Sequence, residues 1–236
     1  MIGDIMKEKC QLPARLTGNQ LKLLAMLAMT CDHVGLQLFP ELDFLRWIGR
    51  LAMPLYAYMI AEGCRYTRNR KRYFMGIALL GLVCQLVYFF AMGSLYQCIL
   101  VTFSLSILLI YLLDNAKGFL GWVNLFIGIF IAWFLSSMLP EMLAHTDFRI
   151  DYDMWGIALP VLIYLGKNRK ESLLLAALGL VMLGINYGGE QWLGLLALIP
   201  LAFYDGTRGK ARIKWLFYLY YPAHLVIIYL LSMIFK

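Results

Sequence analysis

Long apolar stretches, separated by short polar segments, run through nearly the whole chain. They lie at about 19–39, 44–63, 74–92, 97–113, 119–140, 153–166, 171–187, 190–204 and 215–235. A helix needs about 20 apolar residues to cross a bilayer, and most of these runs approach that length. The runs between 153 and 204 are shorter, so merging or splitting a pair of them would leave the other spans unchanged. We predict an all-α, polytopic membrane protein with about nine transmembrane helices.

The composition supports this interpretation and limits what else the chain contains. Of its 236 residues, 62% are hydrophobic and only 15% are charged, which is too little polar surface to cover a water-soluble globule. The apolar runs leave no room for a separate soluble domain, which excludes a self-contained nucleotide-binding fold. We expect a cytosolic N-terminal segment at 1–18 and a single transmembrane domain at 19–236.

The charges alternate along the chain in a way that predicts its orientation. Most of the 21 lysine and arginine residues fall in segments that alternate with acidic segments, such as 41–43, 141–153 and Glu190. Basic loops face the cytosol, so the N-terminus is predicted inside and the C-terminus outside. The net charge of +7 comes from short basic blocks between apolar runs. We therefore expect the lipid bilayer, and no nucleic acid, as a partner.

A few polar residues fall within the predicted spans. Placing such side chains in the membrane costs free energy, so we treat them as candidates for a function. Asp32 and His33 lie in the outer half of the first span, and Arg50 enters the second span from outside to a similar depth. Asp32 and Arg50 could form an ion pair that only stabilises the fold. This structural interpretation does not explain the presence of His33 beside them. Pro54 is expected to kink the second span beside Arg50. His224 lies near mid-bilayer in the last span.

Two basic segments on the predicted cytosolic side are candidates for binding a polyphosphate. The basic run 65–72 has two interpretations. The simpler one is a signal that fixes the membrane topology and contacts anionic lipid, and the other is a binding segment for a polyphosphate. In the segment 204–210, Gly206 and Gly209 would let the backbone approach an anion closely, although the spacing of a P-loop is missing. The candidate cations of the two segments are Arg68, Arg72, Arg208, Lys210 and Arg212.

The absence of other motifs narrows the chemistry. The sequence has no HExxH, no GxSxG and no paired cysteine ligands, so we expect no metal and no intramembrane metalloprotease or serine hydrolase. Two intramembrane histidines favour a group transfer with a histidine as general base. The competing class is a proton-coupled transporter that uses the same histidine, arginine and aspartate side chains. A scaffold without chemistry explains the intramembrane charges least well.

Several motifs in combination resemble the TraX family. In the N-terminal half they include Leu21-Lys22-Leu23-Leu24-Ala25, Asp32-His33-Val34-Gly35, Arg46-x-x-Gly49-Arg50, Ala61-Glu62-Gly63 and Thr67-Arg68-Asn69. The C-terminal half adds Tyr204-Asp205-Gly206-x-Arg208-Gly209 and Tyr221-Pro222-x-His224. The resemblance extends over the chain from about residue 16, with only hydropathy matching between 85 and 150. Met53, Tyr56 and Tyr58 replace the phenylalanines usual around Pro54.

This resemblance implies an acetyltransferase of the bacterial cytoplasmic membrane that takes its acetyl group from acetyl-CoA. The family is named for acetylating pilin, but no motif identifies the acceptor here, which we expect to be a protein, peptide or glycan at the membrane. The expected catalytic residues are His33, Asp32, Arg50 and His224. Beside the five candidate cations, the motifs add Glu62, Asp205 and Tyr221 to the expected donor-binding residues.

Overall fold

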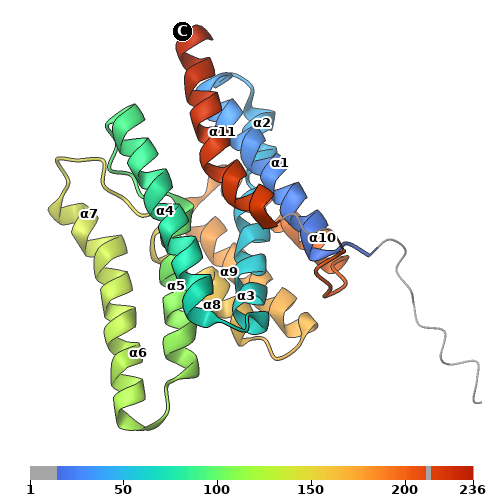
Figure 1. The fold of residues 1–236 in the computed structure, drawn as a ribbon, viewed down its shortest axis with the longest axis vertical. Coiled ribbons are helices and arrows are strands. Elements are labelled where there is room, and N and C mark those ends of the chain that lie inside the picture. Colours follow the sequence, from blue (N-terminus) through green and yellow to red (C-terminus); the bar gives the residue numbers. More distant parts are fainter. Residues whose placement is uncertain (1–14, 211–213, 236) are drawn as a thin grey trace, which may run out of the picture.

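The computed structural model describes residues 15–210 and 214–235, and all regular elements in these ranges are helices (Figure 1). They are α1 (Gly18–Gln37), α2 (Asp43–Gly49), α3 (Ala52–Tyr66), α4 (Arg70–Met92), α5 (Ile99–Asp114), α6 (Gly118–Trp133), the π-helix η2 (Phe134–Met138), α7 (Leu139–Met142), α8 (Asp153–Leu165), α9 (Arg169–Tyr187), the 3₁₀ helix η3 (Gly189–Ala197), α10 (Leu198–Ala202) and α11 (Lys214–Phe235). The predicted all-α class is confirmed. Most of the predicted segment 1–18 lies outside the described residues.

The second predicted span is divided into two helices beside Arg50, where Pro54 was expected to kink it. The chain breaks at Arg50 and Leu51, between α2 and α3. Pro54 has no N–H, so the carbonyl of Arg50 four residues earlier cannot receive a helical hydrogen bond from it, and the proline ring also clashes with that carbonyl. The break therefore lies one turn before the proline and leaves Arg50 between two helices.

Helix α3 is the centre of the bundle. Its side chains are buried around most of its circumference, with Leu55, Ala57, Tyr58 and Ala61 at most 1% exposed. It packs against α1, α5 and α8, and its small residues allow these neighbours to approach closely. The neighbouring helices cover α3 on most of its sides, so it lies in the interior of the bundle. The residues at the two ends of α3 are therefore positioned by the core of the bundle.

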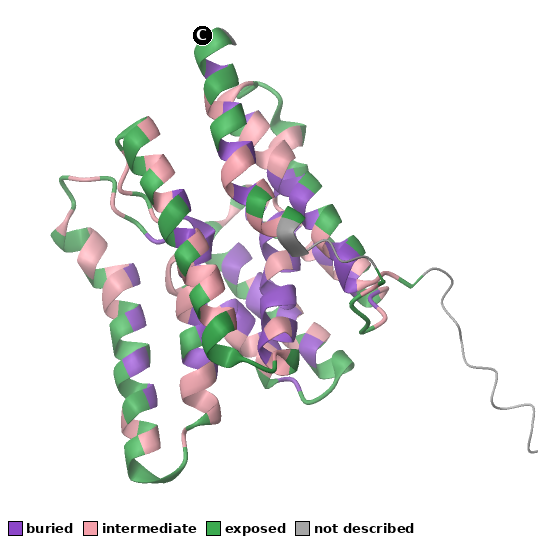
Figure 2. Ribbon diagram, viewed as in Figure 1, coloured by how far each residue is buried: buried purple, intermediate pink, exposed green. Residues whose placement is uncertain are grey.

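The outer helices face away from this core with apolar side chains. Four stretches are long and apolar enough to cross a membrane, namely Arg70–Met92, Gly118–Met142, Arg169–Tyr187 and Leu216–Ile234. Their outer faces are exposed (Figure 2), and Phe90 and Phe119 are 80% and 82% exposed. Apolar surface of this extent is stable in lipid and not in water. The fold is therefore that of a membrane protein.

The connecting segments gather at two opposite ends of the bundle. At the first, which we call the basic end, segments 15–18, 62–72, 163–172 and 201–210 meet; Leu16 N–H donates to the carbonyl of Phe203 at 2.8 Å. At the second, which we call the cavity end, segments 32–50, 92–98, 147–153 and 187–191 meet. There Gln97 N–H donates to the carbonyl of Arg149 at 2.7 Å, and Trp47 Nε1–H donates to Glu190 at 3.1 Å.

Candidate active site

A cavity of about 770 Å³ opens at the cavity end of the bundle. Helices α1, α2, α3 and α4 form part of its wall, and the segments before α8 and after α9 complete it. Its charged and histidine lining residues are Asp32, His33, Arg46, Arg50, Asp147, Arg149, Asp151, Asp153 and Glu190. Six tyrosines line the rest of the wall, namely Tyr56, Tyr88, Tyr96, Tyr152, Tyr187 and Tyr221. A concave site with convergent polar groups is the usual form of an active site.

Two histidines meet at this cavity although they are 191 residues apart in the sequence. His33 on α1 lines the cavity, and its Nδ1 lies 2.8 Å from Nε2 of His224 on α11. His224 is only 4% exposed and lies behind His33, away from the cavity. One turn closer to the basic end, the Thr30 and Tyr220 hydroxyls form a second hydrogen bond between the same helices. The sequence predicted both histidines as catalytic candidates but not their contact.

Asp32 is held by two arginines from the segment that follows α1. Its carboxylate lies 2.9 Å from Arg46 and 3.8 Å from Arg50. The predicted proximity of Asp32 and Arg50 is therefore present, but Arg46 is the closer partner. Gly49 makes this packing possible, because a Cβ at that position would overlap the Asp32 carboxyl group. Asp32 and His33 point to different neighbours, as adjacent residues on a helix must.

Arg50 is surrounded by polar groups and tightly bound to none of them. Its nearest contacts are the hydroxyl of Tyr152 at 3.4 Å, Asp32 at 3.8 Å and Glu190 at 3.8 Å. Oδ1 of Asp32 and Nε2 of Gln191, both on the cavity wall, are buried without a hydrogen-bond partner among the described residues. Buried polar atoms are normally satisfied. The wall of the cavity thus keeps hydrogen-bonding capacity that a ligand could use.

The segment before α8 contributes functional candidates that sequence reasoning missed. Tyr152 and Asp153 have φ angles of 58° and 44°, a left-handed conformation that is rare for tyrosine and more readily adopted by aspartate. Asp151 accepts a hydrogen bond from the Tyr96 hydroxyl at 2.7 Å. Burial raises the pKa of Asp151 to about 6, against the lowering effect of this hydrogen bond. The available signal was the Asp151-Tyr152-Asp153 sequence at the start of an apolar run.

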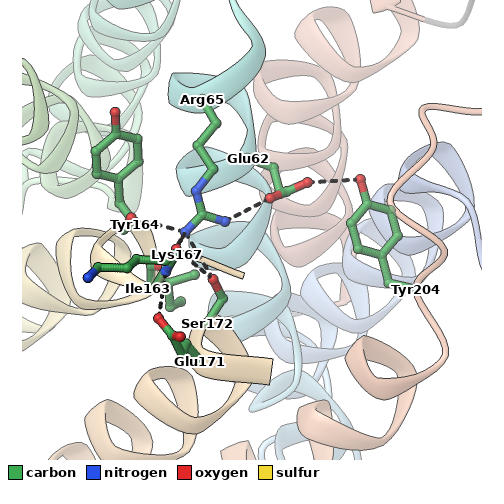
Figure 3. A network of polar contacts seen from close by, with 9 residues as sticks. Glu62, Arg65, Ile163, Tyr164, Lys167, Glu171, Ser172 and Tyr204 are labelled. Atoms are coloured by element: carbon green, nitrogen blue, oxygen red, sulfur yellow. Dashed lines mark hydrogen bonds and ion pairs between the residues drawn. The ribbon is translucent and has the colours of Figure 1, made fainter. Parts of the chain in front are cut away.

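Glu62, a predicted donor-binding residue, takes part in a closed network at the basic end (Figure 3). Its carboxylate accepts hydrogen bonds from Arg65 at 3.0 Å and from the Tyr204 hydroxyl at 3.2 Å. Arg65 also donates to the carbonyls of residues 163, 164 and 166 and to the Ser172 hydroxyl, at 2.6–3.0 Å. These are the orphan carbonyls at the end of α8. The network joins α3, α8, α9 and the segment after α10.

The segment 204–210 at the basic end also has a structural partner. Thr207 and Arg208 accept hydrogen bonds at their carbonyls from Gly18 and Asn19 at the start of α1, at 2.7 and 3.1 Å. Asp205 accepts from Thr207 N–H at 2.7 Å, so this amide is not available to an anion. Gly206 and Gly209 have φ angles of 78° and 86°, which glycine adopts easily. The turn predicted to bind phosphate thus caps α1 with its backbone.

The predicted donor-binding residues do not form one cluster. The cations Arg68, Arg72, Arg208 and Lys210 are exposed at the basic end, while Arg212 lies outside the described residues. Tyr221 is at the other side of the protein, where it lines the cavity and meets His224 edge-on, with ring centroids 5.4 Å apart. Within the described ranges, no group of three or more histidine, cysteine, aspartate or glutamate side chains could hold a metal ion.

Comparisons with known proteins identify the family. The sequence model of the TraX family, described as TraX protein, matches residues 17–232. A probable fimbrial assembly protein, FimC of serogroup H1 from Dichelobacter nodosus, is 27% identical over 244 residues, which cover 89% of this chain and 93% of that protein. A protein of Rickettsia prowazekii (strain Madrid E), described as uncharacterized, is 31% identical over 157 residues, 65% of this chain and 57% of that protein. No solved structure matches. The family match covers almost the whole chain, which therefore belongs to the TraX family.

Proposed function

We propose that this protein is a transmembrane acetyltransferase that moves an acetyl group from cytosolic acetyl-CoA to an amine or hydroxyl of an acceptor. The observation that carries the proposal is His33 on the wall of an open cavity, backed by a second histidine, with a loosely held arginine on the same wall. Acyl transfer needs a base for the acceptor proton and a donor for the oxyanion. Both kinds of group lie at this cavity.

The proposed topology is nine spans with the basic end in the cytosol and the cavity end outside, in the bacterial cytoplasmic membrane. Two features support it. The basic segments 65–72, 167–170 and 208–210 belong to one end, and acidic residues such as Asp147 and Glu190 belong to the other. Helices α1 and α11 run parallel, because Thr30 contacts Tyr220 and, one turn later on both helices, His33 contacts His224. An acceptor would thus enter the cavity from outside, and 19–236 would act as one domain.

In the proposed reaction each residue of the cavity has a distinct role. His33 removes the proton from the acceptor amine or hydroxyl as it attacks the thioester carbonyl. Arg50 has donors without close partners, so it is placed to stabilise the negative oxygen that forms. Asp32 and Arg46 hold Arg50 and the end of α1 in place through their ion pair.

The acetyl donor is proposed to bind at the basic end with its phosphates on exposed cations such as Arg208 and Lys210. These residues suit phosphates because they are free of ion pairs to other described residues and lie beside the start of α1. Fifteen residues of α1 separate Gly18 from His33, roughly 22 Å along the helix. An extended pantetheine arm has a similar length, so the proposal requires the arm to run along α1 and bring the thioester to the histidine while the phosphates remain in the cytosol.

The acceptor is proposed to be an extracytoplasmic or membrane protein of a fimbrial system. The support is the relative from Dichelobacter nodosus, whose name assigns it to fimbrial assembly. Surface proteins of this kind reach the outer side of the cytoplasmic membrane, where the cavity is proposed to open. A peptide or glycan with a free amine or hydroxyl would satisfy the same chemistry.

The test uses purified protein in sealed lipid vesicles with acetyl-labelled acetyl-CoA and a pH-sensitive dye. An acetyltransferase releases free CoA and places label on an acceptor from a membrane extract, without a change in vesicle pH. A proton-coupled transporter would instead move protons across the vesicle membrane and leave acetyl-CoA intact. Proton movement without CoA release would overturn the proposal.

A further inference from the structure

His224 differs from His33 in its surroundings, which indicates a different role. It is 4% exposed and does not line the cavity, whereas His33 does. Its ring is fixed on several sides: Tyr220 lies parallel to it at a centroid separation of 5.3 Å and an angle of 6°, and Tyr221 lies edge-on. The Tyr220 hydroxyl is in turn bonded to Thr30. His224 contacts two residues of the cavity wall, His33 and Tyr221, and does not line the cavity itself.

The hydrogen bonds of His224 determine where its proton lies. Its Nδ1 is 3.0 Å from the backbone carbonyl of Tyr220, and a carbonyl oxygen can only accept. Nδ1 of His224 therefore carries the hydrogen. In a neutral imidazole the other nitrogen is then an acceptor, so His224 presents a lone pair at Nε2.

The same reasoning then assigns the proton of His33. Its Nδ1 lies 2.8 Å from the acceptor Nε2 of His224, so Nδ1 of a neutral His33 must be the donor. The two ring planes are inclined by only 23°, and the ring centroids are 5.0 Å apart. The rings therefore meet edge to edge, so the hydrogen on one nitrogen can point at the in-plane lone pair of the other. His33 is thus left with a bare Nε2. No described residue bonds to this nitrogen, and it is the one available to the cavity.

We propose that His224 is a positioning residue, which holds His33 in the tautomer whose unprotonated Nε2 faces the cavity and stabilises the imidazolium formed there by accepting its Nδ1–H. The inference rests on the proposed acetyl transfer. The acceptor X–H attacks the thioester carbonyl carbon, and its proton moves to Nε2 of His33. The C–S bond then breaks, and the thiolate of CoA takes this proton, giving acetyl-X and CoA-SH. Between the two steps the His33 imidazolium donates Nδ1–H to His224.

The most direct test reads the tautomers themselves. The chain has three histidines, so ¹⁵N-histidine labelling gives three ring pairs, which His33→Ala, His224→Ala and His145→Ala assign by loss of signal. At a pH where both rings are neutral, we expect His33 to be protonated at Nδ1 and bare at Nε2. In His224→Gln the amide oxygen can accept the same hydrogen and keep this state, while in His224→Ala it should be lost. A protonated Nε2 on wild-type His33, or a tautomer that His224→Ala leaves unchanged, would overturn the inference.

Turnover provides a second measurement that separates this inference from the proposed function. His224→Ala should lower acetyl transfer about 100-fold with unchanged affinity for acetyl-CoA, and His224→Gln should recover most of it. If wild-type protein transfers acetyl and His224→Ala matches it, the positioning role is wrong while the proposed function holds. If the tautomers are as expected but wild-type protein transfers no acetyl, the proposed function is wrong while the histidine arrangement holds.

Discussion

Two arginines at opposite ends of α3 show how the two ends of this protein differ. Arg65, at the basic end, donates to one carboxylate, three backbone carbonyls and one hydroxyl, all within 2.6–3.0 Å. The side chain of Arg50, at the cavity end, has no polar contact shorter than 3.4 Å among the residues that the structure describes. Both arginines are only partly exposed, at 19% and 15% of their side chains.

This difference separates a structural arginine from a functional one. Both terminal nitrogens of Arg65 are already engaged in short contacts with protein groups, so this guanidinium is committed to the fold. Long contacts leave Arg50 with donors that are oriented but unsatisfied, and such groups are what a reacting oxygen requires. A similar contrast holds for the acids: Glu62 is paired with Arg65, whereas Asp151 is bonded to a tyrosine hydroxyl.

The largest expected effect is on the folding of Arg65→Ala. Removing this side chain leaves Glu62 and the carbonyls at the end of α8 without partners in a buried site. Loss of one partner of a buried pair costs about 3–5 kcal/mol. We expect little folded protein by size-exclusion chromatography in detergent, with normal turnover per folded molecule. Arg68→Ala is the matched control, because Arg68 is exposed on the same segment. Normal yield of Arg65→Ala with lost turnover would reverse the assignment.

The second expected effect is a pH dependence of stability that comes from Asp151. Its pKa of about 6 in the folded chain lies above the ordinary value of 3.8. The folded state therefore binds more protons between these values, and stability falls as the pH rises from about 4 to about 6, by about 3 kcal/mol at most. Asp151→Asn should remove this fall in thermal unfolding curves.

Asp147 is the control for this pH experiment, since a hydrogen bond from Ser94 lowers its pKa. Stability from Asp147 is thus lost as the pH falls, and Asp147→Asn should change the curve in the opposite direction to Asp151→Asn. Identical pH profiles for wild type and Asp151→Asn would show that burial of Asp151 has no energetic consequence.

A third prediction concerns Arg50→Gln, which tests the arginine at the cavity end as Arg65→Ala tests the one at the basic end. This variant should fold, because Asp32 keeps its closer partner Arg46 at 2.9 Å. Turnover should fall about 100-fold with unchanged affinity for acetyl-CoA, as expected when a donor to the oxyanion is lost. Single-turnover acetyl transfer and calorimetric binding separate these quantities. A variant that binds and transfers normally would exclude Arg50 from the reaction.

The smallest expected effect is at the basic end, with Arg208→Ala. One exposed cation contributes about 1 kcal/mol or less, so affinity for acetyl-CoA should fall about threefold to fivefold with an intact fold. Lys117→Ala, an exposed lysine at the start of α6, is the control. Unchanged affinity for Arg208→Ala would remove the segment 204–210 from the donor site.

Much of the fold could be predicted from the sequence, because lipid restricts a spanning chain to helices and each apolar run then identifies one. Depth along a helix also predicted that Arg50 approaches Asp32. Arg46 as the closer partner was accessible to the same reasoning, since positions four apart in a helix share a face. The break at Arg50 and Leu51 follows from Pro54, once the carbonyl four residues before it is considered.

The site itself could be predicted only in part. The contact of His33 with His224 depends on α11 packing beside α1 in parallel, and no local pattern specifies which spans become neighbours. Glu62 was predicted from a motif as a donor-binding residue; its pairing with Arg65, three residues on in α3, was accessible to the same reasoning, whereas its contact with Tyr204 comes from a distant segment. The left-handed backbone at Tyr152 has no sequence signature, because tyrosine rarely adopts a positive φ, whereas the aspartate at 153 adopts it more readily.

The most direct test of the account is acetyl transfer by His33→Ala beside His145→Ala. His145 is exposed and absent from the cavity wall, so its replacement controls for the loss of an imidazole. We predict that both variants fold and bind acetyl-CoA, that His145→Ala transfers acetyl like the wild type, and that His33→Ala loses at least about 100-fold in rate. Transfer by His33→Ala at a near-normal rate would contradict the claim that the cavity end is the active site.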